Sequence, residues 1–242
     1  MPDTPGEHVA EAAPKSLVAR FTGMIVSPRD TFRSVVAHPR WLGMLALVCL
    51  GMAVLIGGYL STTVGQQAWL DAATSSPFTG PVSDQQYAAM EKMAPYAGYL
   101  AIGQMLVMTP VLFLVTAGIL FAVFNAALGG AATFKQLFSV VVHSSAVSLL
   151  GQLYTVPMNY ARGTLSSATN LGVVLPMVDE TSFIGRLAGM VDLFIIWWLV
   201  VLAIGLGVLY RRRTPPIAWS LMAVYAVIAL IVAVVRSRMG GA

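Results

Sequence analysis

Five long stretches of this sequence carry almost no charged side chains, and they limit the folds open to the chain. A transmembrane helix needs roughly 20 mostly apolar residues to cross about 30 Å of hydrocarbon, and each stretch supplies that many. Of the 242 residues, 57% are hydrophobic and only 10% are charged, whereas soluble domains contain about 25% charged residues. We therefore expect an all-α, polytopic membrane protein with five transmembrane helices preceded by an amphipathic interfacial helix.

The predicted spans lie between consecutive charged residues. Pro110 falls inside the second span, where the missing backbone donor favours a kink, and Asp192 is the only carboxylate inside a span. A very apolar soluble bundle would show polar faces at helical period, whereas these segments are apolar all round. The spans make up a transmembrane domain of residues 41–236, and they are predicted at 41–63, 96–128, 136–158, 187–210 and 217–235.

The chain before the first span divides into two parts. Residues 1–15 are rich in Pro, Glu, Asp and Ala, which predicts a disordered cytoplasmic tail. Residues 16–40 show apolar side chains at helical spacing, and a Ser-Pro-Arg-Asp sequence from Ser27 supplies a helix start. This pattern is typical of an amphipathic helix lying in the headgroup plane. A helix packed against the bundle would bury the same residues, so both arrangements stay open.

The loop between the first two spans is too long for a simple connector. Short helices are predicted around residues 66–73 and 83–93, and the second begins with a Ser-Asp-Gln-Gln capping box from Ser83. At the other end of the chain, residues 237–242 are expected to form a C-terminal tail.

The distribution of Lys and Arg predicts the orientation, because positive residues prefer the cytoplasmic side. With a cytoplasmic N-terminus, nine basic residues lie inside and five lie outside. The triplet Arg211, Arg212 and Arg213 contributes most to this difference, while Arg236 and Arg238 oppose it. We expect a bacterial inner-membrane protein with its N-terminus in the cytoplasm and its C-terminus outside; a re-entrant span would instead place the C-terminus inside.

Polar side chains within the spans mark candidate functional sites, since polar groups in hydrocarbon cost free energy unless they are paired. Asp192, Gln104, Gln152 and Asn159 are predicted to lie at similar depths and to form a polar cluster in the outer half of the bundle. Such a cluster is either an interhelical hydrogen-bond clasp, with about 1 kcal/mol per bond, or an ion or proton site. Both interpretations remain open from the sequence.

A second candidate site lies nearer the inner side. His143 lies among several serines in the third span, and Asn125 near the end of the second span is its expected partner. No second His or Cys stands at ligand spacing from His143, so we expect no metal site.

Sequence motifs of enzymes are absent from this chain. It has no GxxxxGK[ST], HExxH, GxSxG or CxxC motif. Cys49 is the only cysteine, which excludes an intrachain disulfide. We therefore expect no enzymatic activity and no cofactor.

The net charge of +4 is spread along the chain as flanks of apolar stretches. This arrangement argues against nucleic acid and favours a bilayer with anionic headgroups as the partner. Small-residue pairs such as Gly57-Gly58 and Gly185 with Gly189 indicate close helix packing within the chain, and secondarily a homo-oligomer or contact with other membrane proteins. The expected headgroup contacts are Arg29, Arg33, Arg40, Trp41, Arg211, Arg212 and Arg213.

Three stretches in the same order resemble the Yip1 family of small polytopic membrane proteins. They are SPRDTFRSVVAHPRW at 27–41, GGAATFKQLFSVVVH at 129–143 and VDLFIIWWLVVLAIG at 191–205. The resemblance implies a five-helix bundle with a cytoplasmic N-terminus and no catalytic residues. Eukaryotic members associate with Rab GTPases and vesicle-trafficking machinery, but their acidic N-terminal domain has no counterpart here.

Two functional hypotheses follow. The first is a non-enzymatic scaffold or accessory partner of other membrane machinery, in trafficking or export. The alternative is a small ion, proton or solute channel or transporter whose polar path includes Asp192. A clasped Asp192 in a packed interior would favour the scaffold, whereas a continuous hydrated path would favour transport.

Overall fold

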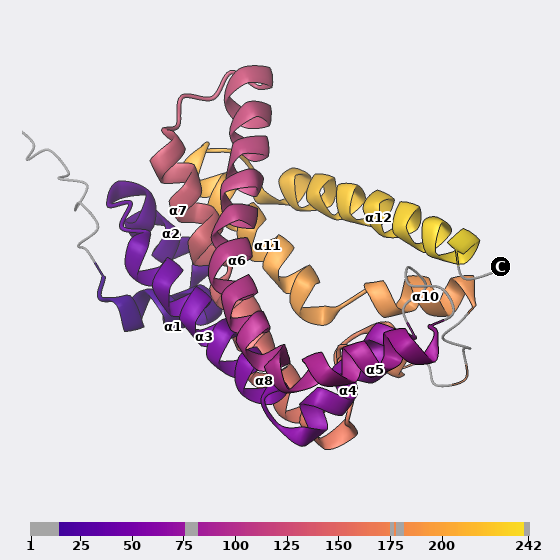
Figure 1. Ribbon diagram of the computed structural model, residues 1–242. Helices are drawn as coiled ribbons and strands as arrows, with labels where there is room; N and C mark the ends of the chain where they lie inside the picture. Colours follow the sequence, from indigo (N-terminus) through magenta and orange to yellow (C-terminus); the bar gives the residue numbers. More distant parts are fainter. Residues whose placement is uncertain (1–14, 76–81, 175–176, 178–181, 240–242) are drawn as a thin grey trace, which may run out of the picture.

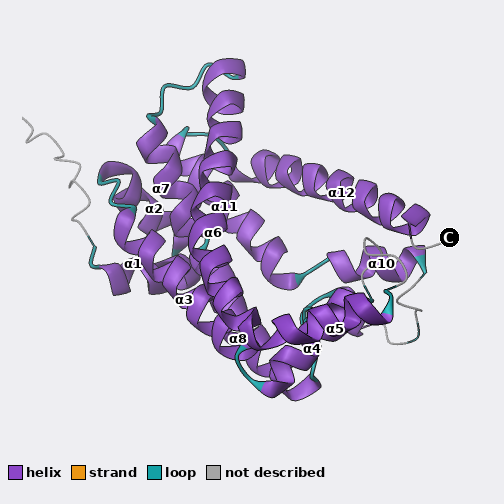
Figure 2. Cartoon of the chain, in the orientation of Figure 1, coloured by secondary structure: helices purple, strands orange, loops and turns teal. Residues whose placement is uncertain are grey.

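In the computed structural model, every regular element of the described residues (15–75, 82–174, 177 and 182–239) is a helix (Figure 2). Within this part of the chain, two shorter apolar helices, Leu17–Val26 and Leu193–Leu209, accompany four helices that are long and apolar enough to cross a membrane. Those four are Leu42–Leu60, Asp84–Ala127, Phe134–Arg162 and Thr214–Val235. The all-helical prediction is therefore confirmed.

The two predicted tails fall mostly on residues that the structure does not describe. Only Lys15 of the N-terminal segment 1–15 is described. Of the C-terminal segment 237–242, residues 237–239 belong to the last helix and the others lie outside the described residues.

The N-terminal segment forms two helices, α1 (Leu17–Val26) and α2 (Pro28–Ala37), where the sequence predicted a single interfacial unit. The second helix starts at Pro28 as expected, because a proline at the first helical position lacks only a donor that would be unpaired there. Helix α2 packs against the bundle, and Phe32 is fully buried. A Cβ atom at Gly205 would stand 2.9 Å from the Phe32 ring, so glycine leaves the space for this contact.

Helices α3 (Leu42–Leu60) and α6 (Ala97–Phe121) pack against each other (Figure 1). A Cβ atom at Gly57 would lie 3.2 Å from the Gly98 carbonyl oxygen, and one at Gly98 would lie 2.8 Å from the Gly57 carbonyl oxygen. The two glycines therefore permit close backbone approach within the chain. Helix α6 contains Pro110 and is followed by a π-helical turn, Ala122–Ala127.

The connection between α3 and α6 contains the two predicted short helices. They are α4 (Thr63–Thr74) and α5 (Asp84–Met93), and a 3-10 turn, Ala94–Tyr96, joins α5 to α6. The predicted capping box is confirmed, because Ser83 and Gln86 exchange their side-chain and backbone hydrogen bonds.

The third predicted span consists of two consecutive helices, α7 (Phe134–Ser144) and α8 (Ala146–Arg162). Thr133 and Gln136 form a capping box at the start of α7. Helix α8 ends at Gly163, whose φ of +62° is a left-handed conformation that glycine adopts without steric cost.

The fourth predicted span, 187–210, is not one helix, and this prediction was wrong. A short helix α10 (Phe183–Met190) ends before Val191, and α11 (Leu193–Leu209) starts after Asp192. A hydrophobic count cannot reveal this break, since residues on both sides of it are apolar. A one-turn helix, α9 (Leu171–Val174), packs against α10.

The last helix, α12 (Thr214–Met239), starts beside α11 and diverges from the bundle toward α10 (Figure 1). Only 17% of its most apolar window is buried, the same share as for the long helix that contains α6. By contrast, 72% of the α7–α8 window is buried. Helices α7 and α8 thus form the centre, while α6 and α12 present apolar faces outward.

The main core is one cluster of residues from α1, α2, α3, α6, α7, α8, α11 and α12. Its fully or almost fully buried members include Met24, Phe32, Val35, Met44, Val140, Val141, Val147, Leu202 and Leu206. The N-terminal helices α1 and α2 therefore contribute apolar side chains to the bundle core, and they also carry basic residues.

Replacing Phe32 by alanine should destabilise the bundle, because the ring is fully buried against α7 and α11. Phe-to-Ala changes in packed cores cost about 3–5 kcal/mol. The expected result is a clearly lower thermal midpoint of the detergent-solubilised protein, followed by intrinsic fluorescence. The control is Arg29→Ala on the exposed side of α2. An equal midpoint for the two variants would contradict the packing of α2 in the core.

Candidate functional site

One face of α8 carries a row of polar side chains. Ser148, Gln152, Thr155 and Asn159 follow at intervals of four, three and four residues, which places them on one side of a helix. Thr155 and Asn159 are buried. The row therefore points toward neighbouring protein segments.

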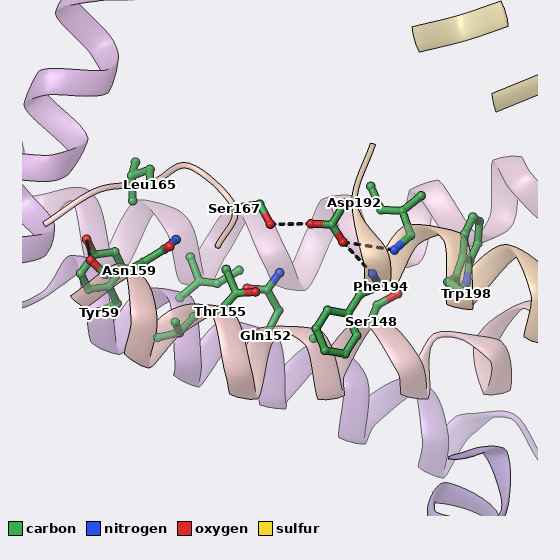
Figure 3. A pocket seen from close by; sticks show the side chains of 14 residues that line it. Tyr59, Ser148, Gln152, Thr155, Asn159, Leu165, Ser167, Asp192, Phe194 and Trp198 are labelled. Carbon is green, nitrogen blue, oxygen red and sulfur yellow. Dashed lines mark hydrogen bonds between the residues drawn. The ribbon is translucent and has the colours of Figure 1, made fainter. Parts of the chain in front are cut away.

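Asp192 faces this row from the break between α10 and α11 (Figure 3). Its side chain is only 8% exposed. The Oδ1 atom accepts hydrogen bonds from the backbone N–H groups of Phe194 at 2.8 Å and Ile195 at 3.3 Å. Asp192 is thus the N-cap of α11, where a carboxylate pairs first-turn donors and interacts favourably with the helix dipole.

The second carboxylate oxygen of Asp192 binds a loop. Oδ2 accepts hydrogen bonds from the hydroxyls of Ser167 at 2.5 Å and Thr169 at 2.7 Å. Together with the two amide contacts, these make four hydrogen bonds, which we call the Asp192 clasp. Backbone bonds run beside it, from Leu171 N–H to the Val191 carbonyl at 2.9 Å and from Leu193 N–H to the Thr169 carbonyl at 3.2 Å. The loop therefore pairs the polar groups that the helix break exposes.

Two tyrosines connect this region to other helices. The Tyr59 hydroxyl at the end of α3 lies 3.2 Å from the Asn159 carbonyl oxygen and 3.0 Å from that of Thr164. The Tyr225 hydroxyl of α12 donates to the Met190 carbonyl at the end of α10. Helices α3, α8, α10 and α12 are thus all hydrogen-bonded around the loop and the break.

A cavity of about 380 Å³ lies between α8, α11 and the loop (Figure 3). Two buried polar atoms of its lining residues, Asn159 Oδ1 and Trp198 Nε1, have no hydrogen-bond partner among the described residues. One is an acceptor and the other a donor. The cavity is lined by Ile56, Tyr59, Ser148, Gly151, Gln152, Thr155, Val156, Asn159, Leu165, Ser167, Asp192, Phe194, Ile195 and Trp198.

Three of the four residues of the predicted polar cluster line this cavity, namely Gln152, Asn159 and Asp192. Gln104 does not, because it lies on the exposed side of α6. Asp192 stands at a helix start instead of five residues inside a helix.

Sequence reasoning missed several lining residues. The helical spacing of Gln152 and Asn159 could have indicated Ser148 and Thr155. An aspartate directly before the apolar run of α11 is also a helix-start signal. No local pattern indicated Ser167 or Thr169, which reach Asp192 only through the fold of the loop.

The predicted inner pair does not form. His143 is fully buried, and its Nδ1 lies 2.7 Å from the Ser139 carbonyl oxygen. Its Nε2 lies 3.2 Å from Nη1 of Arg20, which also donates to the Arg40 carbonyl at 2.6 Å. A guanidinium only donates, so Nε2 is the acceptor and Nδ1–H donates to Ser139. Burial and the neighbouring Arg40 lower the pKa of Arg20 below its usual value, yet an arginine stays charged.

Asn125 has other partners. Its Nδ2 donates to the Ala132 carbonyl and its Oδ1 accepts from the Tyr210 hydroxyl, both at 2.7 Å. The Tyr210 ring stacks on Phe124 with centroids 4.8 Å apart. Asn125 therefore fixes the loop between α6 and α7 to the end of α11. His143 and Asn125 act at separate contacts.

The described part of the chain contains no group of three or more His, Cys, Asp or Glu side chains suited to hold an ion. The hydrogen bonds of Asp192 instead come from hydroxyl and amide donors. Its geometry is that of a structural acceptor.

Comparison with known families gives one match: the Yip1 domain, over residues 22–236. The matched range includes α2, the polar face of α8, the helix break and the Asp192 clasp. No curated protein and no solved structure matches the chain.

Replacing Asp192 by alanine should destabilise the protein, because two amides and two hydroxyls lose their acceptor. Loss of an N-cap alone costs about 0.5–2 kcal/mol, which lowers the thermal midpoint of a protein of this size by roughly 1–8 °C. Asp192→Asn keeps a capping oxygen and should lose less. The matched control is Glu91→Ala, which removes an exposed carboxylate. Equal midpoints for Asp192→Ala and Glu91→Ala would show that the clasp contributes nothing.

Proposed function

The chain belongs to the Yip1 family, and from this premise we propose that it is a non-enzymatic scaffold or accessory partner of other membrane machinery, in trafficking or export. The family is linked to membrane trafficking, and its members are generally not enzymes. The chain is an integral membrane protein by its helices and its family. The proposed role therefore depends on the proteins and lipids that the chain contacts within the membrane.

The pairing of Asp192 is the observation that carries this proposal. An ion or proton path needs a polar group that can exchange its partners, whereas Asp192 makes four hydrogen bonds to groups of its own chain. Beyond the cavity, the core of α7, α8 and α11 is filled by apolar side chains, including Val140, Val147 and Leu202, which are at most 1% exposed. Both features favour a fixed bundle over a conduit.

We include five spans in the proposal by adding α11 to the four long apolar helices. Its 17 residues extend about 25 Å, at the lower end of what a bilayer requires. The other four spans are α3, α6 with its π-helical turn, the joined helices α7 and α8, and α12.

The proposed orientation has the N-terminus in the cytoplasm of a bacterium and the C-terminus outside the inner membrane. The Gln136 side chain donates to the Val36 carbonyl at 3.2 Å, and both residues line a cavity with Arg211 and Arg212. The basic N-terminal helices thus lie at the same end of the bundle as the arginine triplet. This arrangement supports a shared cytoplasmic side under the positive-inside rule.

The exposed side of α6 is the surface proposed for lateral partners. Leu112 is 61% exposed, and a Cβ atom at Gly103 or Gly118 would meet nothing within 4 Å. These glycines are free of intrachain packing, unlike Gly57. An apolar face with open glycines suits either lipid or another transmembrane helix.

Photocrosslinking in native membranes tests this role. A benzoylphenylalanine at Leu112 should give a discrete protein adduct, because this position is exposed on the surface proposed for lateral partners. The same group at Phe138, a buried aromatic position, is the control and should give none. Products are separated by gel electrophoresis and identified by mass spectrometry. Lipid adducts alone from Leu112 would argue against a scaffold that uses this face.

The second candidate function is transport of an ion, a proton or a small solute through a path that includes Asp192. The cavity beside Asp192 favours it, since the polar side chains of Gln152 and Thr155 in its lining could bind a polar solute.

Flux measurements separate the two functions. Under the scaffold proposal, protein reconstituted in liposomes should pass protons, sodium and potassium no faster than empty vesicles, because Asp192 is fully paired and the core is packed. Fluorescent indicators inside the vesicles report each flux. A flux above that of empty vesicles that Asp192→Asn changes would establish transport and overturn the scaffold proposal.

A further inference from the structure

A groove of about 670 Å³ lies between the end of α6 and the start of α12. In Figure 1 this is the region where α12 diverges from the bundle. Its walls are apolar, and its lining includes all three residues of the arginine triplet Arg211, Arg212 and Arg213. The apolar lining is contributed chiefly by Leu120, Val123 and Phe124 on one side and by Ile217, Leu221 and Val224 on the other.

The arginine triplet has no carboxylate partner in the described part of the chain, where the one ion pair joins Arg33 and Asp30. All three arginines are exposed. Arg212 donates one N–H to the Leu128 carbonyl at 3.0 Å, which holds its side chain across the turn from α11 to the end of the π-helical segment. The other guanidinium donors are available to an anion, and arginine forks match phosphate oxygens well.

The backbone at Arg211 places the triplet directly after the end of α11. Its φ of +53° is left-handed, and among the described residues it is the sole non-glycine with a positive φ. The Arg212 N–H donates to the Gly207 carbonyl oxygen at 3.0 Å, so Arg211 holds the left-handed position of a helix C-cap, which glycine and asparagine adopt more easily than arginine. This turn brings the three arginines together among the residues that line the groove.

The apolar wall of the groove is long enough to contact an acyl chain. From Pro216 to Val224 it extends about 12 Å along α12, compared with the roughly 15 Å of hydrocarbon in one leaflet. The charged end lies where the predicted span ends and the headgroup region begins. Apolar walls below a cluster of cations match the two parts of an acidic phospholipid.

We propose that this groove binds an acidic phospholipid of the cytoplasmic leaflet, with an acyl chain between α6 and α12 and the phosphate held by the arginine triplet. The site is separate from the Asp192 cavity and does not depend on the scaffold role, while its assignment to the cytoplasmic leaflet rests on the proposed orientation. It would fill the space at which α12 leaves the bundle, so the lipid becomes part of the packing of the last helix.

Native mass spectrometry of the full-length protein tests the proposal. The protein is delipidated and then exposed to phosphatidylglycerol or phosphatidylcholine in detergent. Wild type should retain phosphatidylglycerol preferentially. Changing all three arginines to glutamine should weaken retention at least tenfold, since each basic residue contributes about 1 kcal/mol to contact with anionic lipid. The matched control is Lys92→Gln, which removes an exposed cation on α5 and should leave retention unchanged.

Two further variants separate binding from folding. Arg211→Asn suits the left-handed backbone, so it should keep or raise the thermal midpoint while it weakens lipid retention. Leu221→Trp fills the groove and should reduce retention with every arginine in place. Water-soluble glycerol phosphate should not compete with the lipid, because it lacks the acyl chain.

Three results would overturn the proposal. They are equal retention of the two lipids by wild type, unchanged retention after loss of the three arginines, and competition by glycerol phosphate as effective as that by phosphatidylglycerol. The last would mean that the arginines bind a free anion and that the groove binds no lipid.

Discussion

The need to pair every polar group within an apolar environment explains the most unusual part of this structure. A break in an apolar helix exposes backbone donors and acceptors that hydrocarbon cannot satisfy. At the break between α10 and α11, Asp192 caps two amides and binds two hydroxyls of the preceding loop. The Tyr225 hydroxyl satisfies the Met190 carbonyl from α12. The position of the loop, and with it the shape of the cavity beside α8, depends on these contacts.

The sequence predicts what depends on local chemistry and misses what depends on distant contacts. Apolar length predicted the long helices, and Ser83 with its glutamine predicted a capping box correctly. The break at Asp192 was missed because a carboxylate with apolar neighbours on both sides was interpreted by hydrophobicity alone. Gln104 was assigned to the polar cluster and His143 to a pair with Asn125 by their estimated depth, but depth does not determine which face of a helix turns inward. The true partners of these side chains could be identified only from the packing of the helices.

The bundle has a buried centre and exposed apolar faces. Helices α7 and α8 are mostly buried, and α2 fits into the same core through Phe32. Helices α6 and α12 leave most of their apolar surface exposed. A protein of this construction presents surfaces to lipids and to other membrane proteins, as the proposed accessory role in the Yip1 family requires. The cations at the start of α12 fit the same division, because they lie at the edge of the lipid-facing groove.

Hydrogen–deuterium exchange in lipid nanodiscs tests the central claim most directly, namely that Asp192 is a structural acceptor. The amides of Phe194 and Ile195 lie in the first turn of α11, where a helix supplies no partner of its own. If Asp192 caps them as in this structure, both should exchange slowly in wild type, and Asp192→Ala should accelerate both while the amides in the centre of α11 remain protected. Fast exchange of both amides in the wild-type protein would contradict the clasp and return Asp192 to the candidates for a solvent-accessible functional site.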